Sequence, residues 1–215
     1  NFNQVFDKEY KKDLKGLDFN SFQLLDNDLF LFATDYVKKE KLYKVYGAKV
    51  DKSSGDLMED LTELGTYPLE SKKDDYDMKM TTIQNGKSFL MVTNISGDDR
   101  VSLGISILDK NFKKKETTVI NLTIDPKRYS VQDVRLTSNN KIILWGKEYE
   151  ETQVGKKKRK RMVFKQYLMS IYDIKGKKES DVALNSGDRF IISGRLIESA
   201  TGELLLGGFY SNTAK

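Results

Sequence analysis

The stretch Val101-Ser102-Leu103-Gly104-Ile105-Ser106-Ile107-Leu108-Asp109-Lys110 carries the pattern that decides the fold. Apolar side chains stand at every second position of residues 101–107, and Ser or Gly stands between them. Successive side chains of an extended strand point to opposite faces, so this period predicts a half-buried β-strand. The aspartate that follows can accept hydrogen bonds from the next backbone N–H groups. We therefore predict a strand that ends in a turn begun by Asp109.

Similar strand endings stand at Ala48-Lys49-Val50-Asp51-Lys52 and at Ser170-Ile171-Tyr172-Asp173-Ile174-Lys175. Each belongs to a longer unit of short strand, tight turn, second strand, charged loop, long strand and closing strand. The tight turns fall near Asn27, Asn85, Asn139 and Gly202, in clusters of residues that tolerate a positive φ. The predicted units lie near residues 20–66, 76–123, 131–185 and 189–215, and the last holds only two strands.

Four antiparallel strands that recur at this spacing are typical of β-propeller blades. We predict an all-β, propeller-like stack of about 3.5 to 4 blades, with at least twelve strands and helix below about 10%. Three complete units and one half unit are too few to close a ring, because closed propellers have four to eight complete blades. We therefore expect the chain to be part of a larger ring, completed by a missing C-terminal remainder or by another copy of the chain. The compact alternative is a four-bladed ring that residues 1–20 complete.

The N-terminal segment, residues 1–19, leaves two alternatives open. Phe6, Tyr10 and Leu14 recur at helical spacing, and Gly16 follows them, which favours a short helix. The other alternative is a strand that completes the last unit beside residues 204–210.

The closing run Leu204-Leu205-Leu206-Gly207-Gly208-Phe209-Tyr210-Ser211-Asn212 and the Ile-Leu-Asp-Lys turn of residues 107–110 resemble known repeats. They are similar to the β-propeller-like repeats of uncharacterised exported proteins of Bacteroidota-type bacteria, over residues 20–211. The resemblance implies a periplasmic, cell-surface or secreted protein. The sequence has no WD dipeptide, no kelch Gly-Gly pair at the starts of the units and no Asp-box, so the resemblance implies no active-site residues.

Composition excludes several kinds of chemistry. The 215 residues include no Cys and no His, which excludes Cys-His zinc sites, thiol catalysis, disulfides and His-dependent triads. Eleven Phe, eleven Tyr and one Trp predict a packed core. No apolar run approaches about 18 residues, so no transmembrane helix is expected. We predict no cofactor, no metal and no catalytic residue.

One basic run is the candidate binding site. It consists of Lys156, Lys157, Lys158, Arg159, Lys160 and Arg161. Such a run can contact polyanions such as nucleic acid, lipopolysaccharide or lipid head groups, and it is also the composition of a solvated loop tip. No aromatic residues interleave with it, which argues against sequence-specific nucleic-acid recognition. Like charges repel, so we predict an exposed, mobile excursion over residues 150–161 between two paired strands.

Other residues have two interpretations each. The acidic cluster Asp74, Asp75 and Asp77 could bind Ca²⁺, but without EF-hand spacing a polar turn is favoured. Trp145 lies in an apolar strand and is expected in the core. Three tyrosines near the ends of predicted second strands could stack on sugars or peptides, or could pack within blades; they are Tyr36, Tyr149 and Tyr210.

These features favour a non-catalytic binding or scaffold module of an exported or cell-envelope protein, which presents its blade loops to a protein or glycan partner. One alternative is a carbohydrate-acting enzyme that uses Asp/Glu pairs on a propeller. A further alternative is a structural subunit of an envelope assembly.

Overall fold

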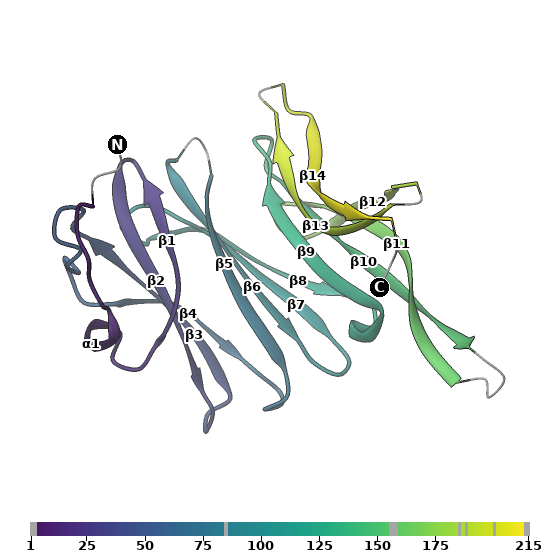
Figure 1. Cartoon of the computed structure of the whole chain (residues 1–215), viewed down its shortest axis with the longest axis horizontal. Coiled ribbons are helices and arrows are strands. Elements are labelled where there is room, and N and C mark those ends of the chain that lie inside the picture. Colours follow the sequence, from purple (N-terminus) through teal and green to yellow (C-terminus); the bar gives the residue numbers. More distant parts are fainter. Residues whose placement is uncertain are drawn as a thin grey trace. The chain divides into compact units, whose positions relative to one another are not determined.

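The computed structural model describes residues 4–83, 86–154, 159–184, 186–187, 189–199 and 201–212. These residues form fourteen strands, one α-helical turn and one 3-10 turn, which confirms the all-β prediction (Figure 1). The elements are α1 Lys11–Leu14, β1 Asp18–Leu25, β2 Asp28–Val37, β3 Leu42–Val50, β4 Thr62–Pro68, β5 Asp75–Ile83, β6 Ser88–Ser96, β7 Val101–Leu108, β8 Lys114–Leu122, η1 Pro126–Arg128, β9 Tyr129–Leu136, β10 Lys141–Val154, β11 Arg159–Asp173, β12 Lys178–Leu184, β13 Phe190–Glu198 and β14 Leu204–Ser211.

The strands form three four-stranded sheets and one two-stranded sheet within the described residues. The strand orders are β1-β2-β3-β4, β5-β6-β7-β8, β12-β11-β10-β9 and β13-β14. Neighbours in each sheet are therefore consecutive in the chain, which is the up-and-down order of propeller blades. The last repeat has two strands here, as the sequence pattern predicts.

Local side-chain chemistry forms the turns that separate the strands. Asn27 has a φ of 64° and Gly202 a φ of 84°, the left-handed conformation that the predicted tight turns require. The predicted Asp turns are also present, because each carboxylate accepts backbone N–H groups from the residues after it. The distances are Asp51–Ser53 2.7 Å, Asp109–Asn111 2.9 Å, Asp109–Lys113 3.0 Å, Asp173–Lys175 2.9 Å and Asp173–Lys177 2.9 Å. Asn85 lies outside the described residues.

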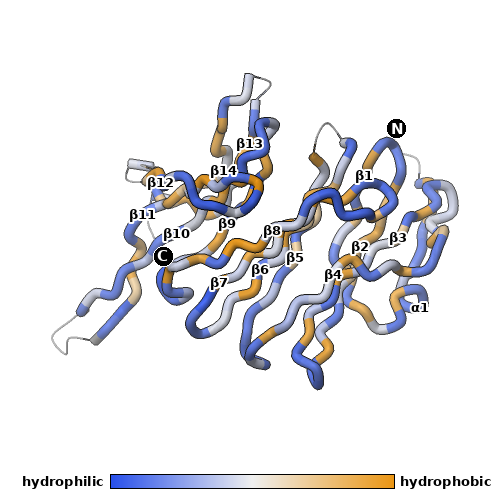
Figure 2. Tube along the Cα trace, turned by 180° about the vertical axis from the view of Figure 1, so that it is seen from behind, coloured by the Kyte–Doolittle hydropathy of each residue, from blue (hydrophilic) through white to orange (hydrophobic). Residues whose placement is uncertain are grey.

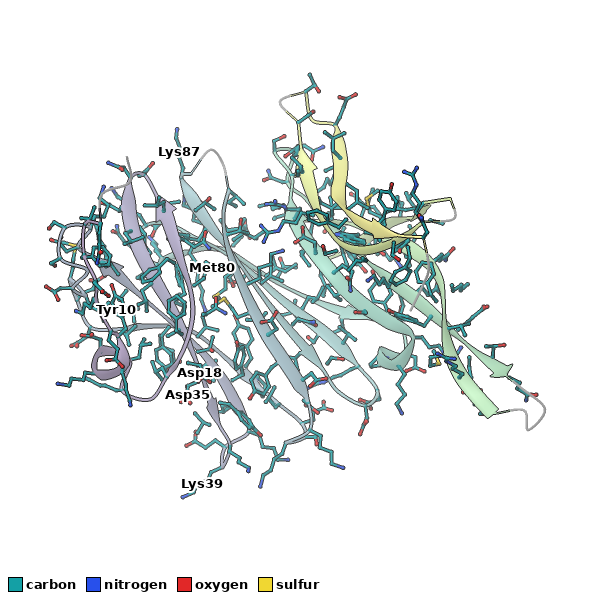
Figure 3. The ribbon with its side chains drawn as sticks, viewed as in Figure 1. Tyr10, Asp18, Asp35, Lys39, Met80 and Lys87 are labelled. Atoms are coloured by element: carbon teal, nitrogen blue, oxygen red, sulfur yellow. The ribbon has the colours of Figure 1, made fainter. Side chains whose placement is uncertain are left out.

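The chain divides into two compact units. The first is Asn1–Gly97 with Ser102–Val119, and the second is Asp98–Val101 with Ile120–Lys215. In the first unit, Phe30 and Phe32 of β2 meet the ring of Phe89 of β6 edge-on, at centroid distances of 5.0 and 5.2 Å. Met80 of β5 is buried in the same cluster (Figure 3). The facing sides of two sheets thus form the core of this unit.

The second unit has its own core. Trp145 of β10, Tyr167 of β11 and Leu196 of β13 are each at most 1% exposed and pack together. This confirms the expectation that Trp145 is a core residue. Burial of these large side chains between the β9–β12 sheet and the β13–β14 hairpin is the main hydrophobic contribution visible in this unit.

In both units, consecutive sheets meet through their first strands. The Asn20 side chain of β1 donates to the Met78 carbonyl of β5 at 2.9 Å. Asp133 of β9 accepts the Leu196 N–H at 3.1 Å, and Arg135 Nε donates to the Leu196 carbonyl at 2.7 Å. Side-chain hydrogen bonds thus join consecutive sheets where no main-chain ladder runs between them, as between neighbouring propeller blades.

The N-terminal segment packs on the first unit. The helical spacing from Phe6 to Leu14 yields only the single turn α1, because so short a helix is marginal without tertiary support. Tyr10 Oη donates to the Gly55 carbonyl at 2.6 Å and holds the segment on the β3–β4 connection. Within the described residues β14 pairs with β13 alone. Asp18 and Phe19 at the end of this segment already belong to β1 and pair with β2, and the completion of the last unit by residues 1–20 stays a prediction.

None of the helices in the described chain has the length and apolar character that a membrane span requires.

Candidate binding surfaces

Strands β10 and β11 continue beyond their sheet. Strand β9 accompanies β10 only as far as Glu148, and β12 accompanies β11 only from Tyr167 onward. Six further residue pairs, from Tyr149↔Phe164 to Val154↔Arg159, have no third strand beside them within the described residues. We call residues 149–154 and 159–166 the arm; it extends past the sheet as a two-stranded ribbon (Figure 1).

The arm corrects the prediction that residues 150–161 form a mobile excursion between two paired strands, because the described residues of that segment belong to the strands themselves. Glu150 pairs with Val163, and Gln153 pairs with Lys160, so the ladder continues through most of that segment. The physical reason is that β-prone residues such as Val163 and Thr152 lie within the charged segment, and that the basic side chain of Lys160 reaches Glu151 diagonally across the two strands.

The predicted basic run spans the end of the arm. Lys156, Lys157 and Lys158 lie outside the described residues, and of Arg159 only the backbone is described. Lys160 and Arg161 lie on β11, and both are exposed. Figure 2 shows the end of the β10–β11 ribbon mostly in hydrophilic colours.

Opposite charges are separated by strand within and beside the arm. Strand β10 carries Glu148, Glu150 and Glu151, whereas β11 carries Lys160, Arg161 and Lys165. Lys160 Nζ lies 2.9 Å from Glu151, and Lys165 Nζ lies 3.0 Å from Glu148. Exposed pairs of this kind contribute about 0–1 kcal/mol each. The arm therefore presents an acidic side and a basic side at little cost or gain in stability.

Glu148 stands where the arm begins. Partial burial opposes ionisation of its carboxyl, but hydrogen bonds from Lys165 and Gln166 outweigh burial and lower its pKa. The Gln166 amide donates to Glu148 at 2.5 Å. These contacts fix the two strands at the point where the sheet narrows to two strands.

The three candidate tyrosines lie in different environments. Tyr149 is half-buried and packs edge-on against Phe164 at 6.3 Å. Tyr36 is half-buried beside Tyr76, with ring centroids 5.0 Å apart. For these two the packing interpretation holds. Tyr210 is 53% exposed, and the Arg189 guanidinium lies 4.5 Å from its ring centroid.

The acidic cluster is divided between a turn and a strand, because Asp74 closes the turn before β5 whereas Asp75 and Asp77 lie on β5. Asp74 is buried, and its carboxylate accepts the N–H groups of Glu70 at 2.9 Å and Ser71 at 3.1 Å. Among the residues that the structure describes, no three acidic side chains are grouped to hold a metal ion.

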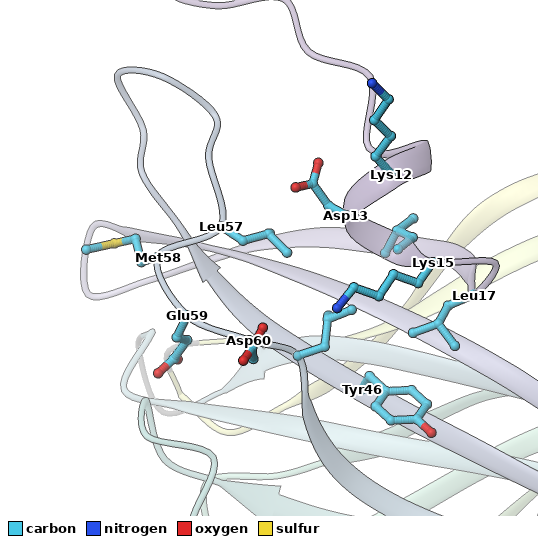
Figure 4. A pocket seen from close by; sticks show the side chains of 11 residues that line it. Lys12, Asp13, Lys15, Leu17, Tyr46, Leu57, Met58, Glu59 and Asp60 are labelled. Carbon is cyan, nitrogen blue, oxygen red and sulfur yellow. The ribbon is translucent and has the colours of Figure 1, made fainter.

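A cavity of 790 Å³ in the first unit was not predicted (Figure 4). Charged side chains of the N-terminal segment and acidic side chains of the β3–β4 connection line it, together with four leucines. The lining residues are Lys12, Asp13, Leu14, Lys15, Leu17, Tyr46, Leu57, Met58, Glu59, Asp60 and Leu61. They come from three separate segments of the chain, so no local motif in the sequence indicates it.

Comparisons with known proteins add little. No protein-family model matches the chain, and no curated protein matches it. Among solved structures, the chain is similar to MPT-1, a GDP-Man-dependent mannosyltransferase from Leishmania mexicana, at 11% identity and a TM-score of 0.29. The match covers 94% of this chain and 84% of that chain. A TM-score this low carries no argument about fold or function.

Proposed function

We propose that the chain is a non-catalytic binding or scaffold module of an exported or cell-envelope protein, and that the arm contacts its protein or glycan partner. One observation carries the proposal: six residue pairs of β10 and β11 continue past the sheet without a third strand. Main-chain pairing alone rarely stabilises an isolated two-stranded ribbon in water, because it buries too little apolar surface.

Apart from Phe164, which packs against the core cluster of its unit, the arm adds little to that core. The fully buried side chains of β10 and β11, such as Trp145 and Tyr167, lie below it in the four-stranded sheet. The described arm side chains are exposed or half-buried. A charged ribbon that the core does not need, and that presents a large surface to solvent, suits recognition of a partner.

A structural role in an envelope assembly is the second candidate. The β13–β14 hairpin exposes large apolar side chains, including Phe209 at 78%, Ile192 at 55% and Leu205 at 54%. Exposed apolar patches of this kind mark contact surfaces in soluble proteins. A glycosidase role has no comparable observation in its favour.

The test compares two variants of equal charge. In the arm variant, serine replaces Lys156, Lys157, Lys158, Arg159, Lys160 and Arg161. In the control, serine replaces six exposed lysines elsewhere, namely Lys38, Lys39, Lys72, Lys73, Lys113 and Lys114. Both variants lower the net charge by the same amount, so any difference between them reports the place of the charges and not their number.

The measurements are the salt concentration that elutes each protein from immobilised heparin and the retention on vesicles with about 30% phosphatidylserine. We expect the arm variant to elute at clearly lower salt than the control. Equal elution of the two variants on both supports would contradict the role of the arm.

A further inference from the structure

The basic strand of the arm has an open edge. Pairing of β12 with β11 begins at Tyr167↔Leu184, so over residues 159–166 the side of β11 that faces away from β10 has no neighbour in the described chain. Alternate residues of a strand direct their N–H and C=O groups to that side. An open edge of this kind is a template on which another extended segment can add as a strand.

Basic residues flank this edge on both faces of the ribbon. Lys160 and Arg161 are consecutive, so their side chains point to opposite faces, and Lys165 stands at the other end of the edge. The Lys160 side chain is 70% exposed. A strand added here would therefore meet positive charge whichever way its own side chains point. Opposite charges across neighbouring strands contribute about 0.2–1 kcal/mol per pair, and like charges oppose pairing.

The charges also argue against a second copy of the chain at this edge. Two arms joined through β11 by a two-fold axis would bring the same basic residues of both copies together. Joining β11 of one copy to β10 of another would match the charges, but this head-to-tail contact does not close on itself. Charge complementarity therefore favours an acidic segment of a different protein.

We propose that an extended acidic segment of a partner protein binds by adding as a strand to the β11 edge of the arm, over residues 159–166. This inference rests on the proposed function, because it names the partner class of the same arm. Main-chain hydrogen bonds to the edge supply pairing, and carboxylates beside Lys160, Arg161 and Lys165 supply selectivity.

The test uses two blocked peptides of about eight residues, one of alternating Glu and Val and one of alternating Glu and Pro. Their charges are equal, but proline lacks the N–H group that a strand must donate. Fluorescence anisotropy with the unmodified chain at about 50 mM salt measures both affinities. We expect the Glu–Val peptide to bind at least about tenfold more tightly.

Equal affinities would overturn strand addition and would leave binding of polyanions by charge alone. That result differs from failure of the proposed function, in which the arm and control variants elute identically from heparin. Two double variants locate the site. K160S/R161S should weaken binding of the Glu–Val peptide several-fold, whereas K113S/K114S should leave it within about twofold. Equal effects of the two pairs would contradict the assignment to β11.

Hydrogen exchange gives a readout that needs no substitution. The bound Glu–Val peptide should slow exchange at alternate amides of residues 159–166, because only every second N–H faces the added strand. Slowed exchange at other sites, without change in the arm, would overturn the proposal.

Discussion

The base and the arm of the β10–β11 hairpin form one continuous ladder but have different physical roles. In the base, residues 141–148 and 167–173, β9 and β12 flank the two strands, and Trp145 is fully buried. In the arm the same strands have only each other, and the Lys160 side chain is 70% exposed. Main-chain pairing thus extends the strands, whereas packing of the β13–β14 hairpin on the sheet decides which of their side chains are buried.

The largest difference should appear when a large side chain is removed from each region. Trp145→Ala leaves a cavity in the base and should lower the free energy of unfolding by about 3–5 kcal/mol. Met162→Ala in the arm removes a half-buried side chain and should cost less than about 1 kcal/mol. Urea unfolding of the full chain measures both. Equal losses would show that the arm is part of the core.

The contact between β9 and β13 should show the next largest effect. Asp133→Ala leaves the buried Leu196 N–H without its acceptor and should cost about 1–3 kcal/mol. Asp133→Asn keeps an oxygen acceptor and should recover part of that loss. If both substitutions cost the same, the hydrogen bond is not what joins the two strands.

Alkaline pH tests the burial of Tyr43. Burial raises the pKa of Tyr43 to about 12. The ordinary pKa of a tyrosine hydroxyl is near 10, so between about pH 10 and pH 12 Tyr43 loses its proton in the unfolded chain first. The free energy of unfolding therefore falls as pH rises, by up to about 1.4 kcal/mol per pH unit.

Tyr43→Phe should therefore make the fall of the urea midpoint between about pH 10 and 11.5 less steep. Phe209→Leu, which changes no titratable group at a site that is 78% exposed, should leave the slope unchanged. A slope that Tyr43→Phe does not alter would contradict the effect of burial.

The smallest effect on stability is expected in the arm itself. Serine at all six basic positions, residues 156–161, should change the free energy of unfolding by no more than about 0.5 kcal/mol, as ordinary surface substitutions do. The six-lysine control should behave alike in this assay. A cooperative loss of structure in the arm variant alone would show that the basic run supports the fold.

Local chemistry made much of the fold predictable. The alternation before Asp109 and the glycine at residue 202 act within a few residues, so the strands, the Asp turns and the four-strand repeat could be inferred. The arm was missed because six adjacent like charges resemble a solvated loop, and its partner charges on β10 become relevant only once the register is known. The first-strand contact of Asp133 with Leu196 joins residues 63 apart and has no local signal.

Excision of the arm tests the central claim, that the base holds the fold and the arm holds the binding. Tyr149 and Phe164 face each other across the ladder, so Asn-Gly can replace residues 150–163 and close the hairpin as a two-residue turn. We expect the free energy of unfolding to stay within about 1 kcal/mol of that of the intact chain. We also expect the shortened chain to elute from heparin at the same low salt concentration as the arm variant. Loss of cooperative unfolding, or elution at the salt of the intact chain, would contradict it.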